Sequence, residues 1–159
     1  MKTNRKGFTL VELLIVIVVI GILSAMMMLS STEATTSAKA SNIVSNLRNL
    51  KTAALALYTD SMDTFADKSN SPTMKQIVKY LNGGAALPES TDYEIVTNGT
   101  NGGWYLQYLF KSGTTAEINQ IKTKLAGRAK SSGLLSANTA GDGSDAAYTG
   151  GDNLYYFVR

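Results

Sequence analysis

The N-terminal region of the sequence is a long apolar run that few polar residues interrupt. Between Phe8 and Leu29, a stretch of 22 residues, only Thr9, Glu12 and Ser24 are clearly polar. Because a helix rises about 1.5 Å per residue, the run would extend roughly 33 Å, enough to cross the hydrocarbon core of a bilayer. The pattern therefore predicts a transmembrane helix over residues 8–29.

This apolar run passes directly into a helical pattern. Apolar residues then recur at spacings of four, three, four and three, namely Ile43, Leu47, Leu50, Ala54 and Leu57. No proline or glycine lies between Ile22 and Tyr58. The pattern predicts one continuous helix over residues 8–60, roughly 80 Å long, with an apolar first half and an amphipathic second half. A secretory signal peptide is the alternative, but its apolar core is usually only about 7–15 residues long.

Residues 61–159 show shorter patterns, which predict a small head domain. A short helix is predicted from Pro72, at its first position, to Leu81, with Asn82-Gly83-Gly84 as its end. Strands are predicted at 93–96 and 104–110 around a glycine-rich turn, and at 154–158. A capping box of Thr114 with Glu117 opens a further helix, whose apolar face contains Ile118, Ile121 and Leu125. The predicted fold class is α+β, with the long helix packed against a small antiparallel sheet and short helices.

The composition excludes several kinds of chemistry. The chain has no cysteine and no histidine, so it has no thiol nucleophile, no Cys/His zinc site and no disulfide. Its net charge of +3 comes from Lys2, Arg5 and Lys6, because the remaining 12 basic and 12 acidic residues balance. Electrostatic binding of nucleic acid by the whole protein is therefore not expected. The same three basic residues predict a cytoplasmic N-terminus and place residues after about 30 outside, by the positive-inside rule.

Glu12 is the unusual residue of the apolar run. With Thr9 it forms the T-x-x-E pattern of a capping box, which would explain a carboxylate at the start of a helix. Capping alone does not explain the long apolar stretch behind it. An ionisable residue inside a membrane span normally has a partner.

These residues together resemble the N-terminus of type IV prepilins and of type II secretion pseudopilins. The resemblance rests on a basic leader ending in Lys6-Gly7, then Phe8-Thr9-Leu10-Val11-Glu12-Leu13, then the apolar run. It implies that a membrane prepilin peptidase removes residues 1–7 by cutting after Gly7, and that the new Phe8 amine is methylated. It also implies assembly into a helical homopolymer through residues 8–29. There, Glu12 of one subunit would neutralise the Phe8 amine of a neighbour.

The resemblance further implies a division of the chain and a set of partners. Residues 1–7 would be the leader, 8–60 the helix and 61–159 the head. The protein would first lie in the bacterial inner membrane as a single-pass protein. An inner-membrane assembly platform with its ATPase would then move it into an extracellular pilus or a periplasmic pseudopilus. Nucleic acid is not an expected partner.

One feature differs from many major pilins. The stretch Ser24-Ala25-Met26-Met27-Met28-Leu29-Ser30 has no proline, which favours a pseudopilin or a minor pilin. The leading hypothesis is a structural subunit of a type IV pilus-like filament, and the alternative is a pseudopilin of a type II secretion system. A membrane-anchored enzyme is more remote, because no motif for a Ser/Lys or paired-Asp site is present. We therefore expect no enzymatic activity.

The head has four further candidate features, for each of which we favour the simpler interpretation. The basic residues Lys122, Lys124, Arg128 and Lys130 scatter around one helix and predict a solvated face rather than a DNA-binding stripe. The acidic residues Asp142, Asp145 and Asp152 are weak candidates for calcium, the one cofactor that the sequence suggests, but their spacing does not match an EF-hand. The aromatic residues Tyr148, Tyr155, Tyr156 and Phe157 predict core rather than an adhesive surface. Asn98-Gly99-Thr100 forms a glycosylation sequon, which predicts little by itself.

Overall fold

The long N-terminal helix predicted from the sequence is confirmed. The structure, a computed structural model, describes residues 7–65, 70–81, 92–98, 102–140 and 142–159. In it, α1 runs without a break over Leu10–Asp60. It begins two residues later than predicted because Thr9 caps it, so Phe8 lies before the first turn. The chain divides into two compact units, one up to Thr35 and one from Thr36 to Arg159.

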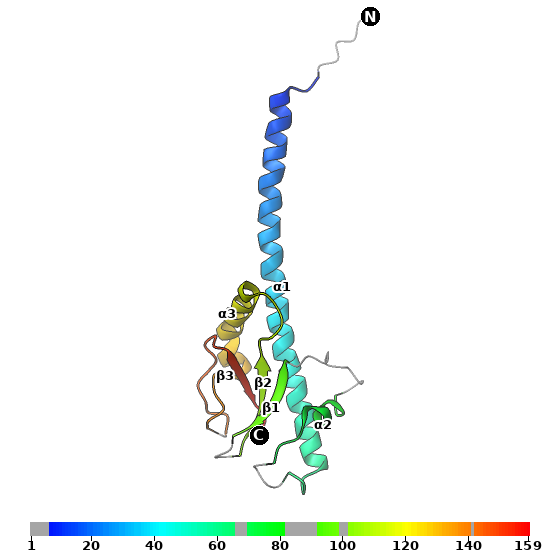
Figure 1. Cartoon of the computed structure of the whole chain (residues 1–159), viewed down its shortest axis with the longest axis vertical. Coiled ribbons are helices and arrows are strands. Elements are labelled where there is room, and N and C mark those ends of the chain that lie inside the picture. Colours follow the sequence, from blue (N-terminus) through cyan, green and yellow to red (C-terminus); the bar gives the residue numbers. More distant parts are fainter. Residues whose placement is uncertain (1–6, 66–69, 82–91, 99–101, 141) are drawn as a thin grey trace, which may run out of the picture. The chain divides into compact units, whose positions relative to one another are not determined.

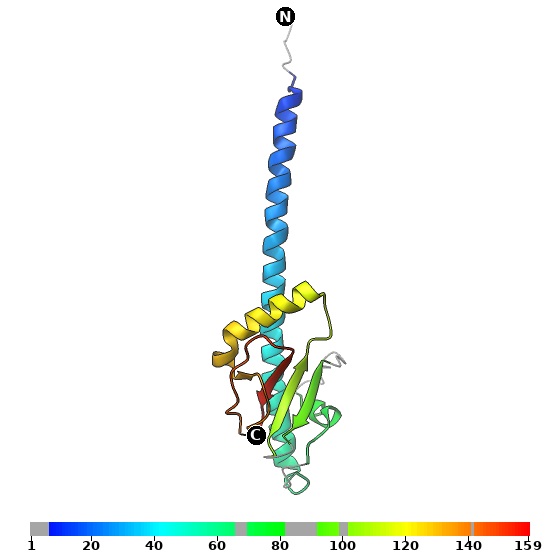
Figure 2. The same cartoon turned by 60° about the vertical axis from the view of Figure 1, so that its left-hand side comes forward.

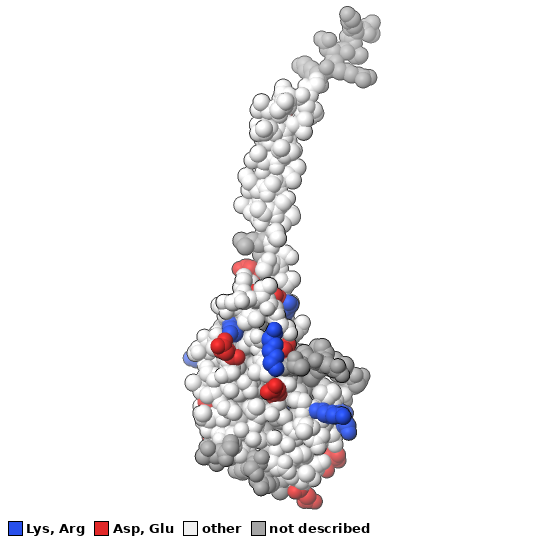
Figure 3. All heavy atoms as spheres, viewed as in Figure 1, with Lys and Arg blue, Asp and Glu red and all other residues white. Residues whose placement is uncertain are grey.

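The first unit contains the apolar half of α1. Among the described residues, α1 is the one helix long and apolar enough to cross a membrane, judged by length and composition. The side chains from Phe8 to Met28 are exposed all round the helix. On the face drawn in Figure 3, this half of α1 carries no charged side chain, whereas charged groups gather on the second unit. The surface of this half of the helix is therefore apolar all round, which is typical of a helix that lies in lipid or inside a protein.

The second unit is built on an antiparallel sheet with the strand order β1-β2-β4-β3 (Figure 1). The strands are β1 (Tyr93–Thr97), β2 (Trp104–Leu109), β3 (Leu134–Leu135) and β4 (Asn153–Phe157). Leu106 of β2 is opposite Ile95 on one side and Tyr156 on the other. The last strand in the sequence thus lies inside the sheet, between β2 and β3. The predicted strands agree within one residue at each end, but β3 was missed because two residues carry no periodic pattern.

The second half of α1 packs against this sheet, as Figures 1 and 2 show. All five residues of the predicted apolar pattern are buried: Ile43, Leu47, Leu50, Ala54 and Leu57. Near the end of α1, the ring of Tyr58 contacts that of Trp104 edge to face, with centroids 5.7 Å apart. About three turns closer to the N-terminus of α1, Asn46 donates a hydrogen bond of 3.1 Å to the Tyr93 hydroxyl. The amphipathic half of the helix is therefore part of the head's core.

Two short helices complete the second unit. Helix α2 spans Met74–Val78 with Thr73 as its N-cap, so Pro72 precedes the cap instead of occupying the first helical position as predicted. The Asn82-Gly83-Gly84 turn lies outside the described residues. Helix α3 spans Thr115–Ser132 and begins at the predicted cap, where the Thr114 hydroxyl accepts from Glu117 N–H at 3.4 Å. It ends at Gly133, whose φ of 71° is the left-handed conformation that glycine adopts most readily.

Candidate functional site

Gly7 and Phe8 lie at the boundary where cleavage is predicted. Both precede α1 and are exposed, and Phe8 is 85% exposed. A Cβ atom added to Gly7 would meet nothing within 4 Å, and its φ is not in the left-handed region. Neither packing nor backbone conformation in the described chain therefore requires a glycine at this position.

Glu12 forms a capping box with Thr9, as the sequence predicts. One carboxylate oxygen, Oε2, accepts hydrogen bonds of 2.8 Å from both the backbone N–H and the hydroxyl of Thr9. In return, the Thr9 hydroxyl accepts a bond of 3.3 Å from the Glu12 N–H. Within the described residues, Oε1 of Glu12 takes part in no hydrogen bond. The carboxylate therefore caps the helix with one of its two oxygens.

The apolar surface behind Glu12 is the largest feature of the first unit. Large apolar side chains including Leu13, Ile17 and Met27 are each more than half exposed. Continuous apolar surfaces of this size mark contacts with lipid or with other protein, because their exposure to water is unfavourable. A capped carboxylate at one end and an apolar surface along 20 or so residues together define the candidate assembly site.

The three candidate calcium ligands, Asp142, Asp145 and Asp152, each interact with different groups of the protein. Asp145 accepts from the N–H and hydroxyl of Thr139, at 3.0 and 2.7 Å, and from the Tyr105 hydroxyl at 3.0 Å. Asp152 forms an ion pair of 2.5 Å with Lys122, which lowers the pKa of its carboxyl group. Asp142 accepts from the N–H of its neighbour Ser144. Among the described residues, no three His, Cys, Asp or Glu side chains gather closely enough to hold a metal ion.

Hydrogen bonds around Asp145 also determine its protonation. Burial alone raises the pKa of this carboxyl group. The hydrogen bonds from Thr139, Tyr105 and Ala140 outweigh burial, so the pKa lies below the usual value for aspartate. Asp145 is thus a charged anchor for the loop that joins β3 to β4.

The basic residues of α3 do not form a stripe. Lys122 pairs with Asp152 and places its ammonium 5.0 Å from the centre of the Phe110 ring. Arg128 points to the other side and donates to Ser41 and Ser37 of α1, at 2.7 and 3.2 Å. Lys130 is exposed. This arrangement agrees with the solvated-face interpretation for part of the helix, but Arg128 belongs to a pocket that the sequence did not indicate.

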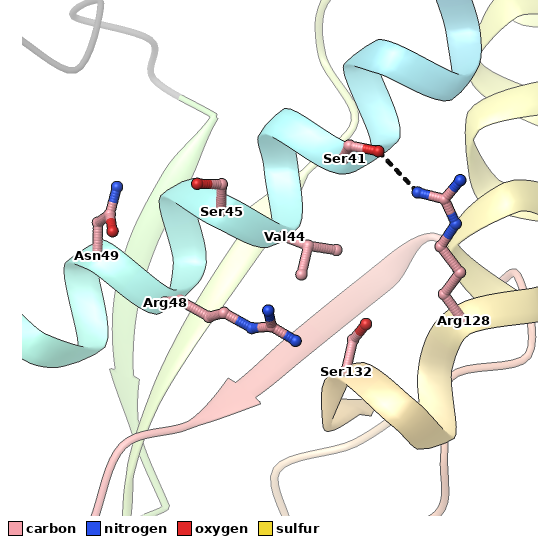
Figure 4. A pocket seen from close by; sticks show the side chains of 7 residues that line it. All are labelled: Ser41, Val44, Ser45, Arg48, Asn49, Arg128 and Ser132. Carbon is pink, nitrogen blue, oxygen red and sulfur yellow. Dashed lines mark hydrogen bonds between the residues drawn. The ribbon is translucent and has the colours of Figure 1, made fainter.

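That pocket lies in the second unit, between α1 and the C-terminal half of α3. It has a volume of about 320 Å³ and is lined by Ser41, Val44, Ser45, Arg48, Asn49, Arg128 and Ser132 (Figure 4). Sequence analysis did not identify Arg48. Its only local signal is a basic side chain on the polar face of α1, which by itself indicates a solvated residue.

The aromatic residues and the sequon also have defined places. Tyr148 is buried, as predicted, while Tyr155, Tyr156 and Phe157 are half-buried on alternating faces of β4. Asn98 is buried, and its side-chain amide donates to the backbone oxygen of Thr139 at 2.5 Å. In this conformation the amide nitrogen that a glycan would modify is engaged inside the protein. The other two sequon residues lie outside the described residues.

Comparison with known families supports the interpretation of the N-terminal site. Residues 2–28 match the family described as the Prokaryotic N-terminal methylation motif. This is the prepilin-type motif of type IV pilins and pseudopilins. The matched segment includes Gly7, Phe8, Glu12 and most of the apolar run, and the match supports a pilin- or pseudopilin-type protein without distinguishing the two. Comparisons with curated proteins and with solved structures gave no match.

Proposed function

We propose that this protein is a structural subunit of a type IV pilus-like filament, which assembles through the apolar half of α1. The observation that carries the proposal is the exposed apolar helix that begins at the Thr9–Glu12 capping box, within the segment that matches the methylation motif. The lipid bilayer covers this surface before assembly. Other copies of the same helix cover it in the filament.

The chemistry of assembly follows from the position of Glu12. A prepilin peptidase cuts after Gly7 and leaves a basic amine on Phe8, which methylation keeps basic. In a dry bundle of helices an unpaired ammonium is costly, and so is an unpaired carboxylate. The Glu12 oxygen that is not used for capping accepts a hydrogen bond from the Phe8 ammonium of a neighbouring subunit. This pair fixes the axial register, because apolar helices alone could slide along one another.

A pseudopilin of a type II secretion system is the second candidate. The observation that favours it is the unbroken course of α1 through residues 24–30, where the sequence has no proline. Both candidates share the same anchor, processing and assembly chemistry. They differ in the length and place of the polymer.

The proposal is tested by locating the polymer in cells with native expression. Antibodies against residues 36–159 should detect the protein in filaments sheared from the cell surface. Detection in the periplasm alone, in cells that secrete through an outer-membrane secretin, would favour the pseudopilin. A protein that stays monomeric in the inner membrane under all conditions would contradict both, and would make a membrane-anchored enzyme worth testing.

A further inference from the structure

The pocket between α1 and α3 brings together two cationic side chains from distant parts of the sequence. Figure 4 shows the Arg48 side chain reaching from α1 toward Ser132, and the Arg128 side chain reaching from α3 toward Ser41. All the residues that line the pocket lie in the second compact unit, from Thr36 to Arg159. The pocket is open to solvent and its volume of about 320 Å³ leaves room for a ligand.

Neither guanidinium has a counter-charge within the part of the chain that the structure describes. The three ion pairs of the described residues involve Lys39, Lys111 and Lys122. Arg128 is held only by the hydroxyls of Ser41 and Ser37, which carry no charge. Arg48 is exposed and its side chain contacts no acidic group among the described residues. Two like charges at one pocket repel each other, so an anion between them would relieve the repulsion.

The two arginines and a serine supply hydrogen-bond donors to this pocket. A guanidinium offers five N–H groups in a planar fork, and the two bonds from Arg128 to serines leave others available. Figure 4 shows the Ser132 side chain beside the Arg48 guanidinium, and Ser132 lines the same pocket. Planar guanidinium forks match the oxygen pairs of carboxylate and phosphate groups, and such charge-assisted bonds are stronger than neutral ones.

We propose that the Arg48–Arg128 pocket is an oxyanion-binding site, which takes a carboxylate or phosphate group. The ligand has one of two sources. It is either a free anion from the surroundings or an acidic side chain of a second copy of this chain. The second source rests on the proposed assembly into a filament, and the first does not. Under either source, binding depends on both arginines and not on the overall charge of the head.

The experiment uses the full chain in detergent micelles, with inorganic phosphate as the probe. Phosphate replaces chloride at constant ionic strength, and unfolding temperature is followed by the fluorescence of Trp104, which is fully buried. A saturable rise is expected for the unchanged protein, because a ligand that binds the folded state stabilises it. Arg48→Gln should weaken the apparent affinity by about tenfold or more, the usual scale for loss of a charge-assisted bond.

Two further variants separate a specific site from a general salt effect. Lys130→Gln removes the same charge from an exposed position two residues from Arg128, and it should leave phosphate affinity unchanged. Arg128→Lys keeps the charge but loses the planar fork, and it should also weaken binding. The proposal is overturned if the unchanged protein shows no saturable rise. It is also overturned if Arg48→Gln responds as the unchanged protein does, since phosphate stabilises many proteins by exclusion from their surface.

Sheared filaments then identify the source of the anion. Phosphorus NMR measures whether the filaments broaden the phosphate signal, with Arg48→Gln filaments as the control. Broadening that depends on Arg48 shows a pocket open to free anions. Its absence, when micelles of the same protein bind phosphate, shows that a neighbouring copy fills the pocket. Failure to obtain filaments would contradict the proposed function, while the micelle experiment would still decide the pocket.

Discussion

The Glu12 carboxylate uses a single oxygen, Oε2, to accept both the backbone N–H and the hydroxyl of Thr9, each at 2.8 Å. Glu12 has two proposed roles, capping its own helix and pairing with the Phe8 amine of a neighbouring subunit. The geometry makes them compatible, because Oε1 takes part in no hydrogen bond within the described chain. The two roles can therefore be separated by substitutions that remove one and keep the other.

Glu12→Gln removes the charge but keeps an oxygen that can cap the helix. If Glu12 pairs with the Phe8 amine of a neighbour, the variant should insert in the membrane and be cut after Gly7, but fail to enter filaments. Breaking a buried pair from one side costs roughly 3–5 kcal/mol, which is a thousandfold or more in a docking equilibrium. The measurement is the yield of sheared filaments relative to the membrane fraction, with the variant as the sole copy.

Thr9→Val is the matched control for this experiment. It removes the hydroxyl that bonds Glu12 and keeps the carboxylate charge, at a cost of about 0.5–2 kcal/mol in helix capping. It should still form filaments. Normal filaments from Glu12→Gln subunits would instead show that the charge is not needed for register.

Cleavage after Gly7 is tested on the mature protein. Mass spectrometry of the N-terminal peptide should find Phe8 as the first residue, with a methyl group on its nitrogen. Gly7→Val should abolish cleavage without disturbing the fold, because a side chain at Gly7 would meet nothing within 4 Å.

Gly21→Ala is the control, since Gly21 is equally open but lies inside α1. It should be processed normally and should favour the helix by about 1 kcal/mol. A mature protein that begins near Ala25 would indicate an ordinary signal peptide, and would rule out assembly through residues 8–29.

Asp145→Asn should destabilise the head. In the unchanged protein, the two carboxylate oxygens accept hydrogen bonds from four donor groups of Thr139, Ala140 and Tyr105. Asparagine offers these donors a single acceptor oxygen. Hydrogen bonds to a charged acceptor contribute about 1.5–3 kcal/mol each, so their loss lowers the free energy of unfolding. Denaturant unfolding of the full chain, followed by Trp104 fluorescence, measures the loss. Asp142→Asn is the control, because its carboxylate bonds only locally to Ser144 and a surface change should stay within about 0.5 kcal/mol.

The difference in the free energy of unfolding between the unchanged protein and Asp145→Asn should also depend on pH. The folded-state pKa of Asp145 is lowered, so its carboxylate stabilises the fold above the unfolded pKa, near about 4. That stability disappears as the pH falls through the lower, folded pKa. The difference between the unchanged protein and Asp145→Asn should therefore be full at neutral pH and shrink in acid below about pH 4. A difference that grew in acid would contradict the anchoring role.

Calcium should have little effect on the unfolding temperature. The carboxylate oxygens of Asp145 are taken by protein donors and Asp152 pairs with Lys122, whereas calcium needs about 6–8 oxygens around it. The full chain is heated in millimolar calcium and in chelator, and the two curves should coincide. A saturable rise in calcium that Asp142→Asn removes would reinstate the loop as a calcium site.

The sequence by itself determined α1, its two halves and its capping box. Helical periodicity and the T-x-x-E pattern act between residues three or four apart, so they are visible before any tertiary contact forms. The five apolar residues from Ile43 to Leu57 and the N-cap of α3 at Thr114 were predictable for the same reason. Cleavage after Gly7, methylation of Phe8 and assembly through Glu12 stay predictions until the processed protein is measured.

Tertiary structure decided which side chains meet across the head. β3 exists because Leu134 and Leu135 pair with β4, and two residues have no period of their own. Asp145 became an anchor because folding brought it to Tyr105, 40 residues away. Arg128 and Ser41 are 87 residues apart, yet they share a pocket with Arg48. Contacts of this kind depend on how elements pack, and packing is set by the whole core rather than by any local pattern.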